Sequence, residues 1–168
     1  AVCATDMLKS KDYIYRCNSA KIKYAIITGY GEATEAFDEH KEQYETIKKK
    51  FVTMHKDAGP DWIDFEDGFY TADTDWVRPT GKQATKADDI MLLAFTSGTS
   101  GYPKILTHDF KYPLGHIMTA VFWQRVVDGG LHLSISDTGW LKAMWGKLYG
   151  QWLGESAIMV YDFDRFDP

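Results

Sequence analysis

A run of small and hydroxylated residues near the middle of the chain has the composition of a phosphate-binding loop. The run consists of Thr96, Ser97, Gly98, Thr99, Ser100 and Gly101, and Lys104 follows it after two further residues. Glycines let the backbone approach a ligand closely, and successive N–H groups in such a turn form a concave anion site. The hydroxyls add hydrogen-bond donors and the lysine adds a positive charge. The combination predicts a loop that binds the phosphates of a nucleotide.

The spacing of this loop differs from the common phosphate-binding patterns. A Walker A loop has the form GxxxxGK followed by Ser or Thr, whereas Gly98 and Gly101 are closer together and Pro103 precedes Lys104. The GxGxxG pattern of dinucleotide-binding proteins does not fit either. A Ser/Gly-rich surface turn is the alternative interpretation. The preceding apolar run at residues 91–95, the Pro-Lys pair and the density of hydroxyls together favour the phosphate site.

The segment TSGTSGYPK, residues 96–104, resembles the phosphate-loop signature of the adenylate-forming enzymes. These enzymes include acyl-CoA synthetases, luciferases and peptide-synthetase adenylation domains. YPLGH, SDTGW, the stretch at 146–168 and the upstream ATDMLKSKDYIYRCNSAK are similar to the acyl-CoA synthetase branch close to the medium-chain enzymes. The resemblance covers nearly the whole chain. It departs at Ser100, where many members have Thr, and that change keeps the hydroxyl.

The resemblance implies an ATP-dependent acyl-CoA synthetase. Such an enzyme joins a carboxylate to AMP with release of pyrophosphate, and CoA then displaces AMP to give a thioester. ATP, Mg²⁺ and CoA are therefore the implied cofactor and substrates. The resemblance also places Trp140 of SDTGW near the acyl group, and His116 of YPLGH could line the same pocket. A core tryptophan and a hydrogen-bonded helix-face histidine are the structural alternatives.

Other interpretations of the chain remain open at this point. It could be a nucleotide-binding or interaction module without catalysis, or a peptide-synthetase adenylation domain, which fits YPLGH and SDTGW less well. The family's magnesium glutamate, ribose aspartate and C-terminal lysine have no counterpart in these residues. We therefore expect no complete set of catalytic residues in this chain. We expect the chain to be an internal fragment of the large N-terminal domain of such an enzyme, and residues 1–168 alone to be inactive.

Composition predicts a packed cytoplasmic protein. Of its 168 residues 45% are hydrophobic and 15% aromatic, which is typical of a globular domain. A net charge of −5 gives no electrostatic reason to expect nucleic acid or an anionic membrane as partner. Cys3 and Cys17 are predicted to be reduced thiols. No Cys/His cluster has zinc spacing, so no metal site is predicted, and the tail carboxylates Asp162, Asp164 and Asp167 are expected to be solvated.

Hydrophobic patterning predicts alternating strands and helices. Strands are expected at 24–28, 51–54, 91–95, 104–107, 131–135 and 157–161, and helices at 11–19, 32–50, 109–127 and 141–153, with a short helix after Asp61. This alternation predicts an α/β fold, a three-layer αβα subdomain over residues 1–168 with a mainly parallel sheet. The loop after Phe95 would then follow a strand end, where such sheets bind ligands.

Individual side chains carry further expectations. Ser10, Asp61 and Asp109 are predicted helix caps, and His108 a helix-start residue. The 32–50 helix rests on one apolar face made of Ala33, Ala36, Phe37, His40, Tyr44, Ile47 and Phe51. Asp137 is expected to order its own turn. Packing roles are expected for Trp123, Trp145 and Trp152.

Overall fold

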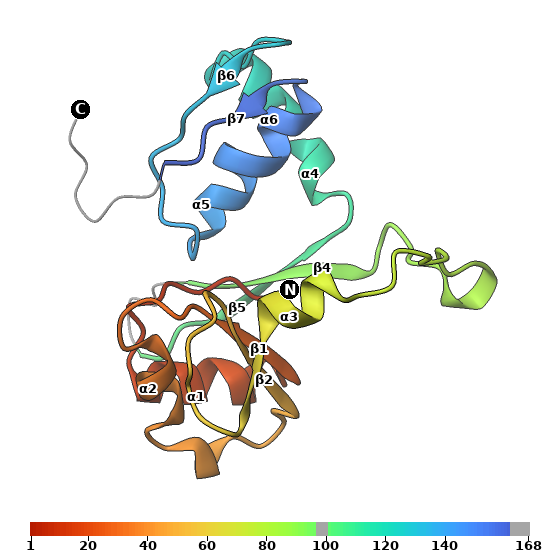
Figure 1. Ribbon diagram of the computed structural model, residues 1–168. Coiled ribbons are helices and arrows are strands. Elements are labelled where there is room, and N and C mark those ends of the chain that lie inside the picture. Colours follow the sequence, from red (N-terminus) through yellow and green to blue (C-terminus); the bar gives the residue numbers. More distant parts are fainter. Residues whose placement is uncertain (97–100, 162–168) are drawn as a thin grey trace. The chain divides into compact units, whose positions relative to one another are not determined.

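The structure, a computed structural model, describes residues 1–96 and 101–161 (Figure 1). Ser97, Gly98, Thr99 and Ser100 of the predicted loop and Asp162, Asp164 and Asp167 of the tail lie outside the described residues. The chain divides into two compact units. The first unit comprises Thr5–Thr85 and the described residues of Phe95–Ile105. The second comprises Ala1–Ala4, Lys86–Ala94 and the described residues from Leu106 on.

A parallel sheet forms the centre of the first unit. Its strands β1 (Tyr24–Ile27), β2 (Lys49–Val52) and β3 (Trp62–Asp64) lie in the order β1-β2-β3, and both pairings are parallel. Its helices are α1 (Ser10–Ser19), α2 (Ala33–Asp38) and α3 (Phe65–Tyr70), and 3₁₀ turns occupy Lys41–Gln43 and Gly81–Gln83. The predicted α/β class with a parallel sheet is confirmed.

The core of the first unit is built around Phe37. This ring is 1% exposed. It packs edge-on against Tyr13 and Trp62 and stacks on Tyr44 at a centroid distance of 4.6 Å. Cys17 and Ala25 complete the buried cluster. Both cysteines are free, as predicted, and burial raises the pKa of the Cys17 thiol to about 11.

The helix predicted over residues 32–50 is wrong. Helix α2 ends at Asp38, and Lys49 and Lys50 belong to strand β2 instead. Phe37 and Tyr44 do meet in one core, but they meet because the chain turns between them, and the Tyr44 hydroxyl donates to the Phe37 carbonyl at 2.8 Å. Strand β2 pairs with strands on both sides, and this tertiary pairing overrides the helical periodicity of the segment.

Two predicted helix caps are also wrong. Ser10 is the first residue of α1, whose N-cap is Lys9, and the Ser10 hydroxyl is buried without a partner among the described atoms. Asp64, not Asp61, caps α3 by accepting a hydrogen bond from the Asp67 N–H at 3.0 Å. Asp61 instead pairs with Lys41. For α3 the cap is Asp64 because β3 ends at that residue and the helix begins directly after it.

Strand β4 (Ile90–Phe95) pairs with β5 (Ile105–Asp109). The Thr96 N–H donates to the Lys104 carbonyl and the Phe110 N–H to the Ala87 carbonyl, so partner numbers run in opposite directions and the pair is antiparallel. The sequence predicted a mainly parallel sheet, whereas this pair is antiparallel. Leu92 is the one buried residue of β4, and Ile90 is 62% exposed. A parallel bridge from Val2 to Leu93 flanks the other side of β4.

The second unit is mostly helical. It contains α4 (Tyr112–Gly115), a π-helical turn (Thr119–Trp123), α5 (Leu141–Ala143), a second π-helical segment (Met144–Tyr149) and α6 (Gly150–Leu153), beside a parallel pair β6 (Leu131–His132) and β7 (Ala157–Ile158). The helix predicted over 141–153 is confirmed as a helical run with a π centre. A side chain at Gly150 would lie 2.8 Å from the Trp145 carbonyl oxygen, so close packing requires glycine there.

The helix predicted over 109–127 is interrupted. Asp109 and His108 belong to β5, so neither starts a helix, although the Asp109 carboxylate does accept a hydrogen bond from the Lys111 N–H at 2.9 Å. Trp145 packs as predicted, whereas the rings of Trp123 and Trp152 are more than half exposed. None of the helices in the described ranges is long and apolar enough to cross a membrane.

The Asp38 carboxylate connects α2 to two strands of the first unit. Its oxygens accept hydrogen bonds from the Lys50 ammonium at 2.7 and 2.9 Å, and one of them also accepts from the Trp62 indole N–H at 2.8 Å. The Lys50 ammonium lies 4.7 Å from the centre of the Trp62 ring. The side chains of Lys50 and Asp38 are only 11% and 25% exposed, so each charge depends on the other for compensation.

We predict that Asp38→Ala destabilises the protein by about 2–4 kcal/mol, between the values typical of exposed and buried ion pairs. The loss arises because Lys50 and the Trp62 N–H would remain buried without an acceptor. Urea unfolding measures the change. Asp61→Ala is the control, since its pair with Lys41 is more than half exposed on both sides; it should cost less than about 1 kcal/mol. Equal effects of the two substitutions would contradict the assigned role of Asp38.

Candidate functional site

The two ends of the predicted phosphate loop are held together by hydrogen bonds. The Thr96 N–H donates to the Lys104 carbonyl at 3.0 Å, and the Lys104 N–H donates to the Thr96 hydroxyl at 3.2 Å. Gly101 has a φ of 127°, a conformation that side chains with a Cβ rarely adopt. The Lys104 side chain is exposed and makes no ion pair with any residue the structure describes. Its charge is therefore available to an anion.

Helix α1 supports this loop through Tyr15. The Tyr15 hydroxyl donates to the Pro103 carbonyl at 2.7 Å, and the ring stacks on Tyr102 at 4.7 Å between centroids. Tyr15 also meets Phe95 edge-on, and the Arg16 guanidinium lies 4.8 Å from the centre of the Phe95 ring. The residues before and after the loop are thus both held by one helix. Sequence reasoning missed Tyr15 and Arg16, because no local pattern distinguishes them from other helix residues.

Trp140 lies at the start of α5 and is 62% exposed. The turn before it forms as predicted, since the Asp137 carboxylate accepts a hydrogen bond from the Gly139 N–H at 2.6 Å and the Trp140 N–H donates to the Asp137 carbonyl at 3.1 Å. The exposure excludes a core role for the Trp140 ring within the second unit. The turn presents an indole ring that a ligand or another part of the protein can cover.

His116 belongs to a series of ring contacts within the second unit. Its ring stacks on Trp145 at 5.4 Å and meets Tyr112 edge-on at 4.6 Å, and Tyr112 in turn contacts His108 at 4.2 Å. Nδ1 of His116 lies 3.2 Å from the Thr119 hydroxyl. Burial, and next the neighbouring His108, lower the pKa of His116, so its ring is neutral at pH 7.

Two polar atoms in this group have no partner among the described atoms. They are the Tyr112 hydroxyl and Nε2 of His108, and both are buried. Burial also raises the pKa of Tyr112 to about 12, so the phenol stays protonated. Buried polar groups are almost always hydrogen-bonded. These two are therefore positioned to bind a polar group supplied from elsewhere. No ring contact in the described ranges joins Trp140 to this group, so a shared pocket of Trp140 and His116 stays a prediction.

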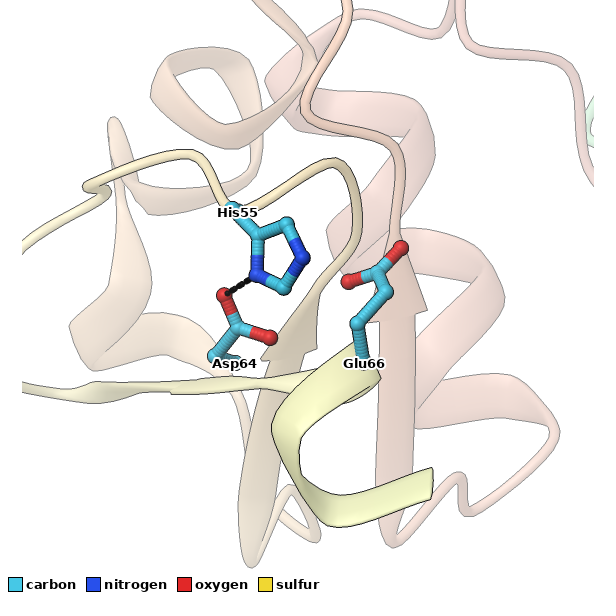
Figure 2. Close-up of side chains that lie close together, drawn as sticks. All are labelled: His55, Asp64 and Glu66. Atoms are coloured by element: carbon cyan, nitrogen blue, oxygen red, sulfur yellow. Dashed lines mark hydrogen bonds and ion pairs between the residues drawn. The ribbon is translucent and has the colours of Figure 1, made fainter. Parts of the chain in front are cut away.

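A third group of polar side chains was not predicted from the sequence. His55, Asp64 and Glu66 each offer a ligand atom within 4.8 Å of the others (Figure 2). Nδ1 of His55 lies 2.9 Å from the Asp64 carboxylate, and this hydrogen bond raises the pKa of His55. The pKa of Asp64 is lowered, first by the hydrogen bond from the Asp67 N–H. The signal that could have revealed the group is the position of each residue at or just after the carboxyl end of a strand.

Comparison with known proteins identifies the relatives of the chain, although no family model matches it. Human acyl-coenzyme A synthetase ACSM3, a mitochondrial protein, is 28% identical over 165 residues, which is 98% of this chain and 27% of the relative. Mouse ACSM3 is 30% identical over 166 residues, covering 97% and 27%. The homologues of this chain are acyl-coenzyme A synthetases. The chain spans about a quarter of the length of these relatives.

Structural comparison gives the same fold. The crystal structure of the anthranilate CoA ligase AuaEII in complex with anthranoyl-AMP matches with a TM-score of 0.77 and 20% identity. The match covers 92% of this chain and 29% of that one. The fold that the resemblance implied is therefore confirmed, and the relatives found are acyl-coenzyme A synthetases. Because the acyl-coenzyme A synthetases named above are mitochondrial, the cytoplasmic location stays a prediction.

We predict that Tyr15→Phe lowers stability by about 1 kcal/mol, the usual value of one hydrogen bond, and loosens the loop end. Without the hydroxyl, Pro103 loses its donor and the neighbouring Lys104 amide should exchange its hydrogen faster. Native-state hydrogen exchange measures this effect.

Tyr44→Phe is the matched control, because its hydroxyl also donates to a backbone carbonyl in the same unit. It should cost similar stability without a local effect at Lys104. Equal exchange at Lys104 in the two variants would show that Tyr15 does not hold the loop.

Proposed function

We propose that this chain is the phosphate-binding part of an ATP-dependent acyl-coenzyme A synthetase. The observation that carries the proposal is the similarity to such enzymes over 98% of the chain, including the TSGTSGYPK segment. The protein as a whole would convert a carboxylate and ATP to an acyl-adenylate and pyrophosphate. CoA would then take the acyl group and release AMP. Its partners would be these small molecules and the remaining domains of the same polypeptide.

The loop over residues 96–104 is proposed to bind the β- and γ-phosphates of ATP. Support comes from the two hydrogen bonds between Thr96 and Lys104, from the Lys104 ammonium, which makes no ion pair in the described ranges, and from the hydrogen bond of Tyr15 to Pro103. A loop whose ends are held in place offers its N–H and hydroxyl groups with less loss of conformational entropy on binding. The backbone and side chains of Ser97, Gly98, Thr99 and Ser100 would supply the inner donors.

The proposed chemistry needs no activated nucleophile from the protein. In the first step a carboxylate oxygen of the substrate forms a bond to the α-phosphorus, and the bond from that phosphorus to the oxygen bridging to the β-phosphate breaks. Pyrophosphate leaves with the bonding electrons. Lys104 and the loop donors stabilise the negative charge that develops on the leaving group. In the second step the CoA sulfur attacks the acyl carbonyl carbon, AMP leaves and the thiol proton passes to solvent or a base.

Magnesium enters this proposal only as the ion that accompanies ATP. The loop supplies hydroxyls and an ammonium, and no carboxylate lies within residues 96–104. Mg²⁺ prefers carboxylate and phosphate oxygens. We therefore assign it no ligand in this chain.

The acyl group is proposed to contact the second unit. His116 is neutral and packed among aromatic rings, a surface that suits an apolar chain. The exposed indole of Trp140 would be covered by the acyl group when it binds. The unpaired Tyr112 hydroxyl and His108 Nε2 would meet a polar atom of the substrate or of a missing part of the enzyme.

We predict that Lys104→Ala in the full-length enzyme slows carboxylate-dependent ATP–pyrophosphate exchange by about 10²–10³-fold, the usual effect of removing one charge-stabilising donor. Thermal stability should be unchanged, because the Lys104 side chain is exposed and unpaired within the described structure. Lys82→Ala, another exposed lysine outside the loop, is the control and should exchange at the wild-type rate. Wild-type exchange in Lys104→Ala would refute the phosphate role.

We predict that Trp140→Ala in the full-length enzyme shifts the preference for acyl chain length by about tenfold, since one methylene in an apolar pocket is worth roughly 1–3 kcal/mol. The KM for ATP should change little. Trp152→Ala is the control, because its exposure of 61% matches the 62% of Trp140. A uniform loss of rate over all chain lengths, with a lower Tm, would mark Trp140 as a packing residue.

A further inference from the structure

The group formed by His55, Asp64 and Glu66 lies at one edge of the β1-β2-β3 sheet. His55 follows the end of β2 at Val52, Asp64 is the last residue of β3, and Glu66 lies in the first turn of α3. Because both pairings are parallel, the carboxyl ends of the strands share this edge. Ligands of open parallel sheets bind beyond that edge. The topology therefore brings a nitrogen ligand and two carboxylates to a place where binding sites form.

One carboxylate oxygen in this group lacks a partner. Oε1 of Glu66 accepts a hydrogen bond from the Met54 N–H at 2.9 Å, which fixes the carboxylate. Oε2 is buried and has no hydrogen bond among the described atoms. A buried anionic oxygen without a donor or cation is costly. The nearest lysine in sequence, Lys56, is engaged with Glu35 and the Gly31 carbonyl, so it does not neutralise Glu66.

We propose that His55, Asp64 and Glu66 bind a divalent metal ion, and that the ion is Zn²⁺. Figure 2 shows the imidazole ring and the two carboxylates gathered at one place, with Asp64 bonded to Nδ1. Two ionised carboxylates and a neutral imidazole together carry two negative charges, which balance the two positive charges of the ion. Imidazole favours a transition metal over Mg²⁺ or Ca²⁺, which take oxygen ligands. The unpartnered Oε2 of Glu66 would gain the ion as its partner.

The geometry requires only a small adjustment. The ligand atoms lie within 4.8 Å of one another. Ligands of one tetrahedral zinc ion are about 3.3 Å apart, since each bond is roughly 2 Å long. Rotation of the His55 side chain, which is 61% exposed, can shorten these distances while Asp64 stays in place as the cap of α3. Three protein ligands leave one position for water or for a ligand from outside, the arrangement of an open zinc site.

Zn²⁺ titration by calorimetry tests the proposal on the chain of residues 1–168. The wild-type protein should bind one Zn²⁺. His55→Asn and Glu66→Gln should each weaken Zn²⁺ binding by at least about tenfold. This is the lower limit of the loss seen when a residue that only hydrogen-bonds a metal ligand is removed. Asn tolerates the left-handed φ of 50° at position 55, and Gln keeps an acceptor for the Met54 N–H. Circular dichroism checks that each variant is folded.

His40→Asn is the matched control. His40 lies 3.9 Å from Glu42 and is exposed, so it forms a histidine–carboxylate pair without a third ligand. This variant should keep wild-type affinity. Co²⁺ absorption separates the proposed site from the thiols of Cys3 and Cys17, because a nitrogen–oxygen site lacks the thiolate charge-transfer band.

A second measurement uses only the wild-type protein. In NMR spectra, addition of Zn²⁺ should shift the imidazole resonances of His55 at the lowest metal concentrations and leave those of His40 unchanged. The absence of saturable Zn²⁺ binding would overturn the proposal and mark the group as an ion pair that only holds the loop after β2. Wild-type affinity in both His55→Asn and Glu66→Gln would overturn it as well, by placing the metal elsewhere.

Discussion

The ion pair between the partly buried Lys50 ammonium and the Asp38 carboxylate organises the first unit. Asp38 ends α2, and its carboxylate accepts from Lys50 of β2 and from the indole of Trp62 in β3. These strands are short, so backbone pairing alone fixes little of their position. A lysine in the middle of a buried strand would be unfavourable unless an anion were placed over it. The need to satisfy Lys50 therefore sets where the helix stops and how it lies on the sheet.

Parallel pairing then determines where function can develop in this unit. Strands β2 and β3 end at the same edge, and side chains at or just after their ends converge there. The proposed phosphate loop belongs to the same unit but has a different support. It follows β4, a strand of an antiparallel pair, and α1 holds its far end through Tyr15. The unit thus combines a proposed ion-binding edge with a loop held at both ends.

The second unit has exposed aromatic side chains, and some of its buried polar atoms have no hydrogen-bond partner among the described atoms. Its helices pack closely at Gly150 and at the fully buried Ala120 and Gln151. Around that core, Trp140 remains exposed and the hydroxyl of Tyr112 lacks a partner in the part of the chain described. Such a surface suits contact with a ligand or with another part of a protein.

Local chemistry in the sequence predicted the elements that depend on neighbours along the chain. The strand at Tyr24–Ile27, the Asp137 turn and the helical run over 141–153 need only nearby residues. The proposed phosphate loop and the family resemblance were likewise inferred from contiguous motifs. Tertiary structure alone decided the rest. Residues 32–50 have helical periodicity, yet α2 ends at Asp38 because β2 pairs on both sides and Lys50 requires a carboxylate. The support from Tyr15 joins segments far apart in sequence. The His55 group depends on how β2 and β3 pair, which no local pattern records.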